Sequence, residues 1–187
     1  MSRIVYTLLV TAAATLFTSA AFAQGTKSAL KQHIHQEGRF EALMPADTKS
    51  TKSIKGIKTK RNAYEAEGNH NGADFTIVVE EISAVELTGD KKTNTTAAFI
   101  DFTFKRLKRE FGNDVTKKII QQHGMQGAHF YVRYLDKDSG QKFDITKRVL
   151  FDGKRTYSAT HIATSNTDSL NLRTKFLDSV KSTITRR

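Results

Sequence analysis

Residues 128–162, AHFYVRYLDKDSGQKFDITKRVLFDGKRTYSATHI, contain three runs in which apolar and polar side chains alternate. The runs are 128–135, 142–151 and 155–162, and a period of two is typical of a strand with one buried face. Asp152-Gly153 joins the last two runs, and Asp-Gly favours a two-residue hairpin turn with positive φ. The sequence therefore predicts an antiparallel β-meander.

The same turn predicts the register of the last two strands. If Asp152-Gly153 forms the turn, Phe151 pairs with Lys154, and every partner beyond it follows. The cross-strand neighbours expected on one side are Arg148 with Tyr157 and Asp144 with His161. The other side is predicted to be the core, with Phe143, Ile145, Val149, Phe151 and Ile162.

More strands and two helices are predicted around the meander. The strands are expected at 40–44, 51–59, 62–67, 74–82 and 114–122, and the helices at 96–111 and 169–184. Apolar residues at helical spacing predict the buried side of each helix: Ile100, Phe104, Leu107 and Phe111 in the first, Leu172, Phe176 and Val180 in the second. This order predicts an α+β fold, an antiparallel sheet flanked by helices in a single domain.

Residues 1–23 have the layout of a secretory signal. Arg3 precedes an apolar stretch from Ile4 to Phe17, and Ala21-Phe22-Ala23 supplies the small residues of a cleavage site. The stretch is shorter than the roughly 20 residues that span a bilayer core, although a buried first helix is the alternative. We expect cleavage after Ala23 and a periplasmic or secreted protein with no transmembrane segment.

After the signal, we expect a flexible lead-in over 24–37 without a convincing strand, and one domain over 38–187. His33 and His35 in the lead-in could offer two imidazoles to a metal, but the sequence suggests no third ligand. We therefore predict no metal site and no cofactor. The chain has no cysteine, which excludes disulfides and thiolate chemistry. Its net charge of +11 favours anionic partners.

Three short motifs in the second half resemble the closing pattern of PsbP-like domains. They are Gly124-Met125-Gln126-Gly127-Ala128, Gly153-Lys154-Arg155-Thr156-Tyr157 and Lys175-Phe176-Leu177-Asp178-Ser179-Val180. This family includes extrinsic photosystem II subunits and non-photosynthetic bacterial relatives such as DcrB-like periplasmic proteins. The resemblance implies an α/β/α sandwich that binds other macromolecules and has no shared catalytic residue.

One group of polar residues could form a ligand or partner site. If Leu135 also lies opposite Lys142, Asp144 would lie between Arg133 and His161, with Arg148 and Tyr157 on the same side of the sheet. A carboxylate between a guanidinium and an imidazole could be a structural ion pair, a ligand clamp or an acid-base pair. The alternative is that these residues only form a polar outer face of the sheet. We predict no catalytic residue.

A basic run without acidic residues covers positions 48–64. We predict an anionic-surface site made of Lys52, Lys55, Lys58, Lys60 and Arg61. The alternative is a purely structural role, in which the run is an edge strand and its lysines prevent sheet-to-sheet aggregation.

These patterns favour an exported, non-catalytic binding module of the bacterial periplasm or cell envelope. Its expected partner is an envelope protein or an anionic envelope surface. A small hydrolase or ligand-processing enzyme that uses Asp144, His161 and Arg133 is the alternative, and a basic protein that acts on anionic surfaces is a third. Nucleic acid is not an expected partner, because the chain has an export signal and no recognised binding motif.

Overall fold

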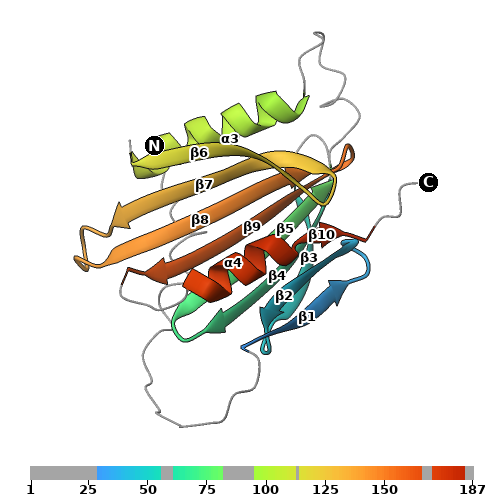
Figure 1. Ribbon diagram of the computed structural model, residues 1–187, viewed down its shortest axis with the longest axis horizontal. Coiled ribbons are helices and arrows are strands. Elements are labelled where there is room, and N and C mark those ends of the chain that lie inside the picture. Colours follow the sequence, from blue (N-terminus) through green and yellow to red (C-terminus); the bar gives the residue numbers. More distant parts are fainter. Residues whose placement is uncertain (1–28, 56–60, 82–94, 113, 166–169, 184–187) are drawn as a thin grey trace.

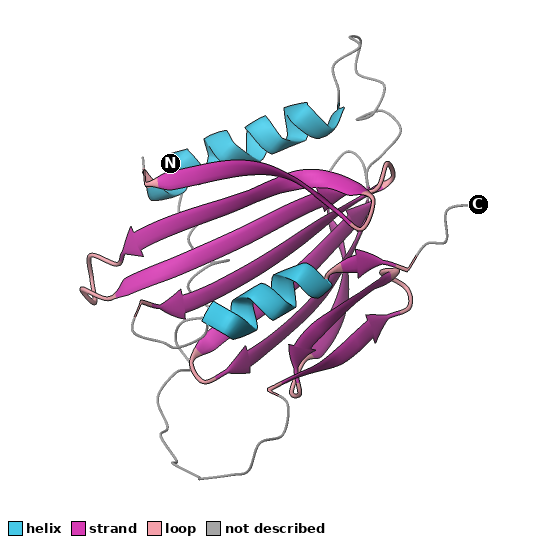
Figure 2. Ribbon diagram, in the orientation of Figure 1, coloured by secondary structure: helices cyan, strands magenta, loops and turns pink. Residues whose placement is uncertain are grey.

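The structure is a computed structural model that describes residues 29–55, 61–81, 95–112, 114–165 and 170–183. Its strands are β1 (Leu30–His35), β2 (Phe40–Pro45), β3 (Lys49–Lys55), β4 (Arg61–His70), β5 (Ala73–Glu81), β6 (Val115–Gln122), β7 (Met125–Leu135), β8 (Lys142–Phe151), β9 (Arg155–Thr164) and β10 (Lys181–Ser182). The helices are α3 (Thr95–Phe111) and α4 (Leu170–Ser179). Figures 1 and 2 show a large sheet with one helix on each side.

The large sheet has seven strands in the order β3-β4-β5-β9-β8-β7-β6, and all their pairings are antiparallel. The predicted meander is confirmed as β7, β8 and β9. Tight turns join the outer strands: Asn71-Gly72 and His123-Gly124 both have positive φ at their two central positions. The predicted α+β class with an antiparallel sheet is therefore confirmed.

The predicted register between β8 and β9 is wrong by two residues. Phe151 pairs with Thr156, so Arg148 lies opposite Ala159 and Asp144 opposite Ala163. The turn is centred on Gly153 and Lys154. The Asp152 amide donates to the Arg155 carbonyl, and the Asp152 carboxylate accepts from the Lys154 and Arg155 amides, both at 2.8 Å. Asp152 therefore precedes the turn instead of forming part of it.

The side of the large sheet that faces α3, here called the α3 side, has the predicted core residues. Ile145 and Val149 lie in a cluster with Ile100 and Leu107 of α3. Phe130 and Val132 of β7 complete the middle of this cluster. This core lies under the β6–β7–β8 half of the sheet.

The opposite side, here called the α4 side, was expected to be an outer polar face, and over β9 and β5 that expectation is wrong. Tyr157 and Ala159 lie there beside Phe75, Ile77 and Val79 of β5. Phe176 and Leu177 of α4 and residues of the small sheet cover them. Because the apolar strand β5 pairs with β9, the side of β9 that was expected to be polar and outward becomes part of the larger core.

The small sheet has the order β1-β2-β10 and includes β1, which lies within the lead-in where no convincing strand was expected. Only Leu30 of this strand is buried, and its sequence shows no clear alternation of apolar and polar residues. The strand forms through antiparallel pairing with β2. Arg39 ends the connecting turn with a φ of 52°. The residues before position 29 lie outside the described part.

The last helix is shorter than expected. α4 ends at Ser179, whose hydroxyl donates to the Phe176 carbonyl and accepts from the Leu43 amide of β2 at 2.7 Å. The chain then continues as β10, paired with β2. Val180, predicted on the helix, is fully buried just after it.

Candidate functional site

Polar side chains gather on the α4 side of the sheet where α4 leaves β7 and β8 uncovered. We name this group the β7–β8 polar face; it consists of His129, Tyr131, Arg133, Asp144, Thr146, Arg148, the neighbouring Lys118 of β6, and Arg173 and Asp178 of α4. Figure 1 shows α4 in front of β9 and β5 on this side, with β8 and β7 beyond β9. Strands β7 and β8 therefore form the base of the site, and α4 forms one side of it.

Arg133 and Asp144 are direct cross-strand partners, as the sequence predicted. Arg133 Nε lies 3.7 Å from Asp144 Oδ1, and the Tyr131 hydroxyl donates to the same oxygen at 2.6 Å. Arg133 Nε also donates to the Tyr131 hydroxyl at 3.0 Å. Since the Arg133 side chain is 77% exposed, its remaining guanidinium donors face solvent.

Arg148 ties the floor of the site to α4. One guanidinium nitrogen donates to Asp178 at 2.7 Å and to the side-chain carbonyl of Gln122. Gln122 in turn donates to the carbonyls of Leu177 and Val180, both at 2.9 Å, and so satisfies the end of α4. Arg148 is therefore in part a structural residue, although its buried Nε has no hydrogen-bond partner within the described residues.

His129 lies among cations. Burial lowers the pKa of its imidazole, and the charges of Arg148, Arg173 and Lys118 lower it further. Arg173 reaches this region from α4, where it donates to the Thr146 hydroxyl at 3.3 Å and lies 5.9 Å from the centre of the Tyr131 ring. Burial and the surrounding positive charge therefore both favour the neutral imidazole.

Two predicted site residues, Tyr157 and His161, lie in the core instead of on this face. The Tyr157 hydroxyl donates to Asp152 at 2.6 Å, and burial raises the pKa of this phenol. His161 is 2% exposed, packs edge-on against Phe75 with ring centres 4.9 Å apart, and lies opposite Thr146. The structure therefore brings together Arg133, Asp144 and Arg148 and separates the other two from solvent.

His161 is a buried imidazole without hydrogen bonds. Neither of its ring nitrogens has a partner within the described residues. Burial and the nearby charge of Arg173 lower its pKa to about 4. Asp144 is opposite Ala163, so the expected Asp144–His161 pairing is not formed.

Arg173, Gln122 and Asp178 were not predicted as site residues. Arg173 and Asp178 lie on α4, and α4 and β6 are separated by three strands along the chain. Their polar side chains look like ordinary surface residues of a helix and an edge strand. No local signal could have revealed that α4 docks beside β8.

The predicted anionic-surface site maps onto β3, which is an edge strand of the large sheet. Lys52 pairs with Glu37 at 2.9 Å and lies 5.4 Å from the centre of the Tyr64 ring. Lys55 and Arg61 pair at the end of the β3–β4 ladder. Lys58 and Lys60 lie outside the described residues.

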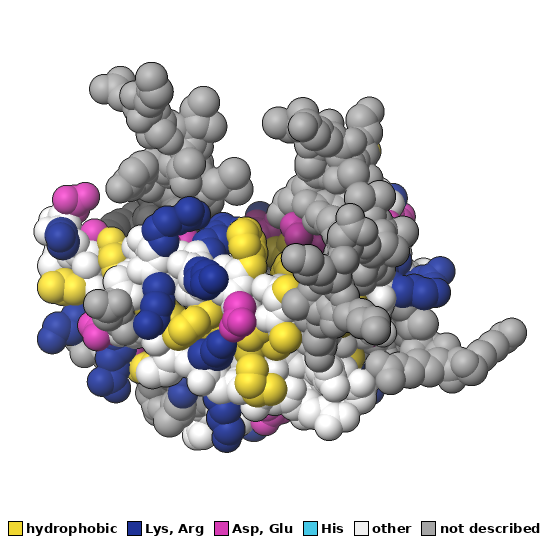
Figure 3. All heavy atoms as spheres, turned by 90° about the horizontal axis from the view of Figure 1, so that it is seen from above, with side chains coloured by type: hydrophobic (Ala, Val, Ile, Leu, Met, Phe, Trp, Pro, Cys, Tyr) yellow, Lys and Arg dark blue, Asp and Glu magenta, His cyan; other side chains and the backbone are white. Residues whose placement is uncertain are grey.

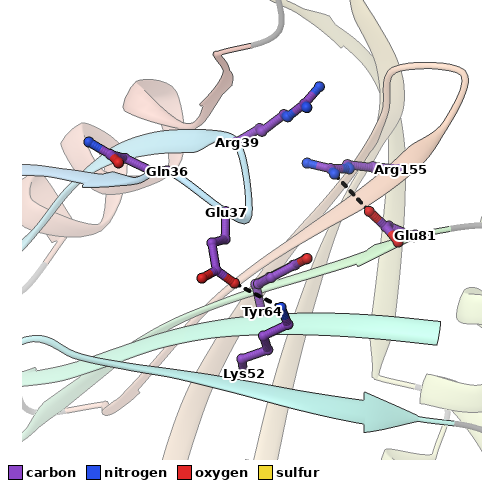
Figure 4. A pocket seen from close by; sticks show the side chains of 7 residues that line it. All are labelled: Gln36, Glu37, Arg39, Lys52, Tyr64, Glu81 and Arg155. Atoms are coloured by element: carbon purple, nitrogen blue, oxygen red, sulfur yellow. Dashed lines mark hydrogen bonds and ion pairs between the residues drawn. The ribbon is translucent and has the colours of Figure 1, made fainter.

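A pocket of about 480 Å³ opens near Lys52, where the β1–β2 turn meets β4, β5 and β9 (Figure 4). It is lined by Gln36, Glu37, Arg39, Lys52, Tyr64, Glu81 and Arg155. Arg155 is buried and donates to Glu81 at 2.8 Å and to the Gly38 carbonyl at 2.9 Å. Because Lys52 also pairs with Glu37, two of the three cations in this pocket already have acidic partners within the chain.

Electrostatics support a structural role for this pocket. Burial raises the pKa of Glu81, but hydrogen bonds from Asn62 and Arg155 and the charges of Arg155 and Arg39 bring it below its ordinary value. Glu81 is thus stabilised as the carboxylate that Arg155 requires. The pair links β5 and β9 to the β1–β2 turn.

The two histidines considered as metal ligands have structural contacts. His33 Nε2 lies 3.0 Å from the Ser50 hydroxyl, and His35 accepts from the Gly38 amide at 2.9 Å and stacks on Phe40. Across the described ranges, no group of three or more His, Asp or Glu side chains is placed to hold a metal ion. In the same ranges, no helix has the length and apolar character needed to cross a bilayer.

No protein-family model and no curated protein sequence matches the chain. Three solved structures are similar: a protein from Bacteroides thetaiotaomicron VPI-5482, the cyanobacterial PsbP (CyanoP) from Synechocystis sp. PCC 6803, and a protein of unknown function from Pseudomonas aeruginosa. Their TM-scores are 0.48, 0.48 and 0.44, and their identities 10%, 10% and 9%.

The matched regions cover 85%, 87% and 86% of this chain. They cover 98% of the Synechocystis protein and 99% of the Pseudomonas protein. The chain spans about half of the Bacteroides protein, 49% of its length. Function must therefore be inferred from the geometry of this chain.

Proposed function

We propose that this protein is an exported, non-catalytic binding module of the bacterial cell envelope, and that its β7–β8 polar face binds an acidic segment of a partner protein. The observation that carries the proposal is the convergence of Arg148, Arg173 and Lys118 on the half-buried His129, which lies opposite Lys118 on one side and Arg148 on the other. The face has more cations than acids, because Lys118 and Arg173 add to the Arg133–Asp144 and Arg148–Asp178 pairs, and this excess favours an anionic partner.

The charge balance of the face supports this reading. Its acids are Asp144 and Asp178, and each already accepts a hydrogen bond or ion pair from within the chain. Arg133 and Lys118 are exposed at the outer part of the face. An incoming carboxylate would therefore meet guanidinium and ammonium donors before it met a fixed acid.

The alternative of a hydrolase at Asp144 is less well supported. A general base must reach the proton that it abstracts. A substrate would have to displace packed side chains to reach His161, whose imidazole does not pair with Asp144. A binding role requires only the exposed donors of Arg133 and Lys118 and the half-buried guanidinium of Arg173.

The PsbP-like resemblance and the export signal agree with this proposal. The family resemblance implies an interaction module, and residues 1–23 imply a location outside the cytoplasm. We propose that the partner is an envelope protein. The basic run around Lys52, Lys55, Lys58, Lys60 and Arg61 is a second candidate for contact with anionic groups.

A titration with polyglutamate tests the site through the imidazole signal of His129. A bound carboxylate would offset the surrounding positive charge, so the pKa of His129 should rise when the peptide is added. NMR of the imidazole protons gives this pKa, and the spectrum of His129→Gln assigns the signal. An unchanged His129 signal at saturating peptide would refute the proposed site.

A matched pair of variants tests whether position or total charge matters. Lys118→Gln with Arg133→Gln removes two exposed cations from the face, whereas Lys49→Gln with Lys137→Gln removes two exposed cations elsewhere. We expect the first pair to weaken polyglutamate binding at least tenfold and the second to have little effect. Equal losses would mean that only net charge matters.

A further inference from the structure

The outward side of α3 has a composition that its packing does not explain. The residues opposite the buried Ile100, Thr103 and Leu107 recur at i, i+4, i+7, i+8 and i+11. We name these residues the α3 outer surface, together with one residue of β6: Ala98, Phe102, Lys105, Arg106, Arg109 and Ile119. A helix that only covers a sheet needs no aromatic residue on its solvent side.

Two large apolar side chains of this surface are exposed. Phe102 is 64% exposed and Ile119 is 63% exposed. Lys117 of β6 reaches Asp101 at 2.7 Å, which places the middle of β6 beside the N-terminal half of α3. Ile119 follows Lys117 on the same side of β6, so both apolar residues lie toward that end of α3.

Cations dominate the charge of this surface. Lys105, Arg106 and Arg109 are exposed, whereas the nearby Asp101 is engaged by Lys117, whose hydrogen bond and charge lower the pKa of that carboxyl. Figure 3, which looks onto this side of the molecule, shows Lys and Arg side chains with hydrophobic side chains between them. The surface therefore offers positive charge and exposed apolar groups together.

We propose that the α3 outer surface docks on an anionic lipid bilayer. Lys105, Arg106 and Arg109 would contact the headgroups, and Phe102 and Ile119 would enter the boundary between headgroups and acyl chains. A bilayer matches both features, because its anionic headgroups lie directly over an apolar layer. This surface lies on the side of the sheet opposite the β7–β8 polar face, and the inference does not depend on the proposed function.

A single fluorophore can report the docking, because the chain contains no tryptophan. Phe102→Trp places the indole at the predicted contact. Ile34→Trp, at a position 55% exposed on β1 of the small sheet, is the matched control. With vesicles of equal parts phosphatidylglycerol and phosphatidylcholine, Phe102→Trp emission should shift to the blue and be quenched by brominated lipid, whereas Ile34→Trp emission should not change.

Charge variants give a second measurement in the full chain. Removing Lys105, Arg106 and Arg109 by Gln substitution should lower vesicle affinity roughly fivefold per charge, about a hundredfold in total. The control removes three exposed cations elsewhere: Lys137, Lys142 and Lys154. Phosphatidylcholine vesicles correct for any binding by the apolar residues 1–23, which all variants share.

Three outcomes would overturn the inference. Equal losses from both sets of charge variants would show that the surface has no special role. Anionic binding without a blue shift of Phe102→Trp would mean that the apolar residues stay in water. A blue shift of Phe102→Trp emission with polyglutamate but not with vesicles would indicate that this surface binds an acidic protein and not a bilayer.

Discussion

At the scale of single residues, His161 should make stability depend on pH. Its pKa is about 4 in the folded chain and about 6.5 when unfolded, so only the unfolded chain binds a proton between these values. Stability should therefore fall as pH drops from 6.5 toward 4 and be unaffected by this group above 6.5. The expected loss between pH 7 and pH 5 is roughly 2 kcal/mol. Urea unfolding at both pH values measures it.

His161→Leu should remove this contribution, because leucine cannot be protonated and suits the apolar contact with Phe75. The difference in pH dependence between wild type and His161→Leu isolates the residue from other histidines. His70→Gln, near the surface, serves as the control and should keep the wild-type slope. A variant His161→Leu with the full pH dependence would contradict the assignment.

Arg155 holds three parts of the fold together through one buried guanidinium. Arg155→Gln would break its contacts with Glu81 and the Gly38 carbonyl and leave a carboxylate with fewer donors. We expect a loss of about 2 kcal/mol in the free energy of unfolding, less than for a fully buried pair because Glu81 is partly exposed. Urea denaturation gives the value, with the exposed Lys154→Gln as control.

The double variant Arg155→Gln with Glu81→Gln tests whether the two residues act as a pair. Removing both charges leaves neither group uncompensated, so the combined loss should be smaller than the sum of the single losses. Additive losses would show that Arg155 stabilises the fold through Gly38 alone.

At the scale of elements, Gly127 allows β7 and β8 to lie close together. A Cβ built at this position would lie 2.0 Å from the Val149 carbonyl oxygen, and backbone cannot move aside cheaply. Gly127→Ala should therefore cost about 3 kcal/mol or more and displace the β7–β8 polar face. Thermal unfolding measures the cost.

Gly140→Ala is the matched control for this glycine. Its φ is 68°, but nothing lies within 4 Å of an added Cβ, so only backbone strain of about 1 kcal/mol is expected. Similar losses at both positions would mean that Gly127 is needed only for its backbone freedom.

The docking of α4 depends on Phe176. This side chain is fully buried and meets Phe75 edge-on with ring centres 5.3 Å apart. Phe176→Ala should cost roughly 3–5 kcal/mol through lost burial and the cavity left behind. Lys175→Ala, on the exposed side of the same helix, should change stability by less than about 0.5 kcal/mol. An unchanged midpoint for Phe176→Ala would mean that α4 does not dock.

At the scale of the whole molecule, residues 1–23 predict export. Because Ala21 and Ala23 are the small residues that a signal peptidase requires, we expect the exported protein to begin at Gln24 or within a few residues of it. Mass spectrometry of the protein from a periplasmic fraction measures its N-terminus. A full-length cytoplasmic product would contradict the export prediction.

The sequence by itself determined the elements whose signals are local. Period-two alternation located β7, β8 and β9, and apolar spacing located α3 to within one residue. The Arg133–Asp144 neighbours were also predictable, because Leu135 and Lys142 were correctly paired across a short connection. Propensity, turn chemistry and periodicity act within a few residues, so one strand or hairpin contains them completely.

Only the tertiary structure decided that the α4 side of β5 and β9 is buried as well. Tyr157 and His161 alternate with other residues as a polar outer face would, yet β5 pairs beside them and α4 covers them. The same long-range packing forms β1, shortens α4 and brings Arg173 to Thr146. Such contacts join segments far apart in the chain, and their free energy comes from burial that no single segment contains.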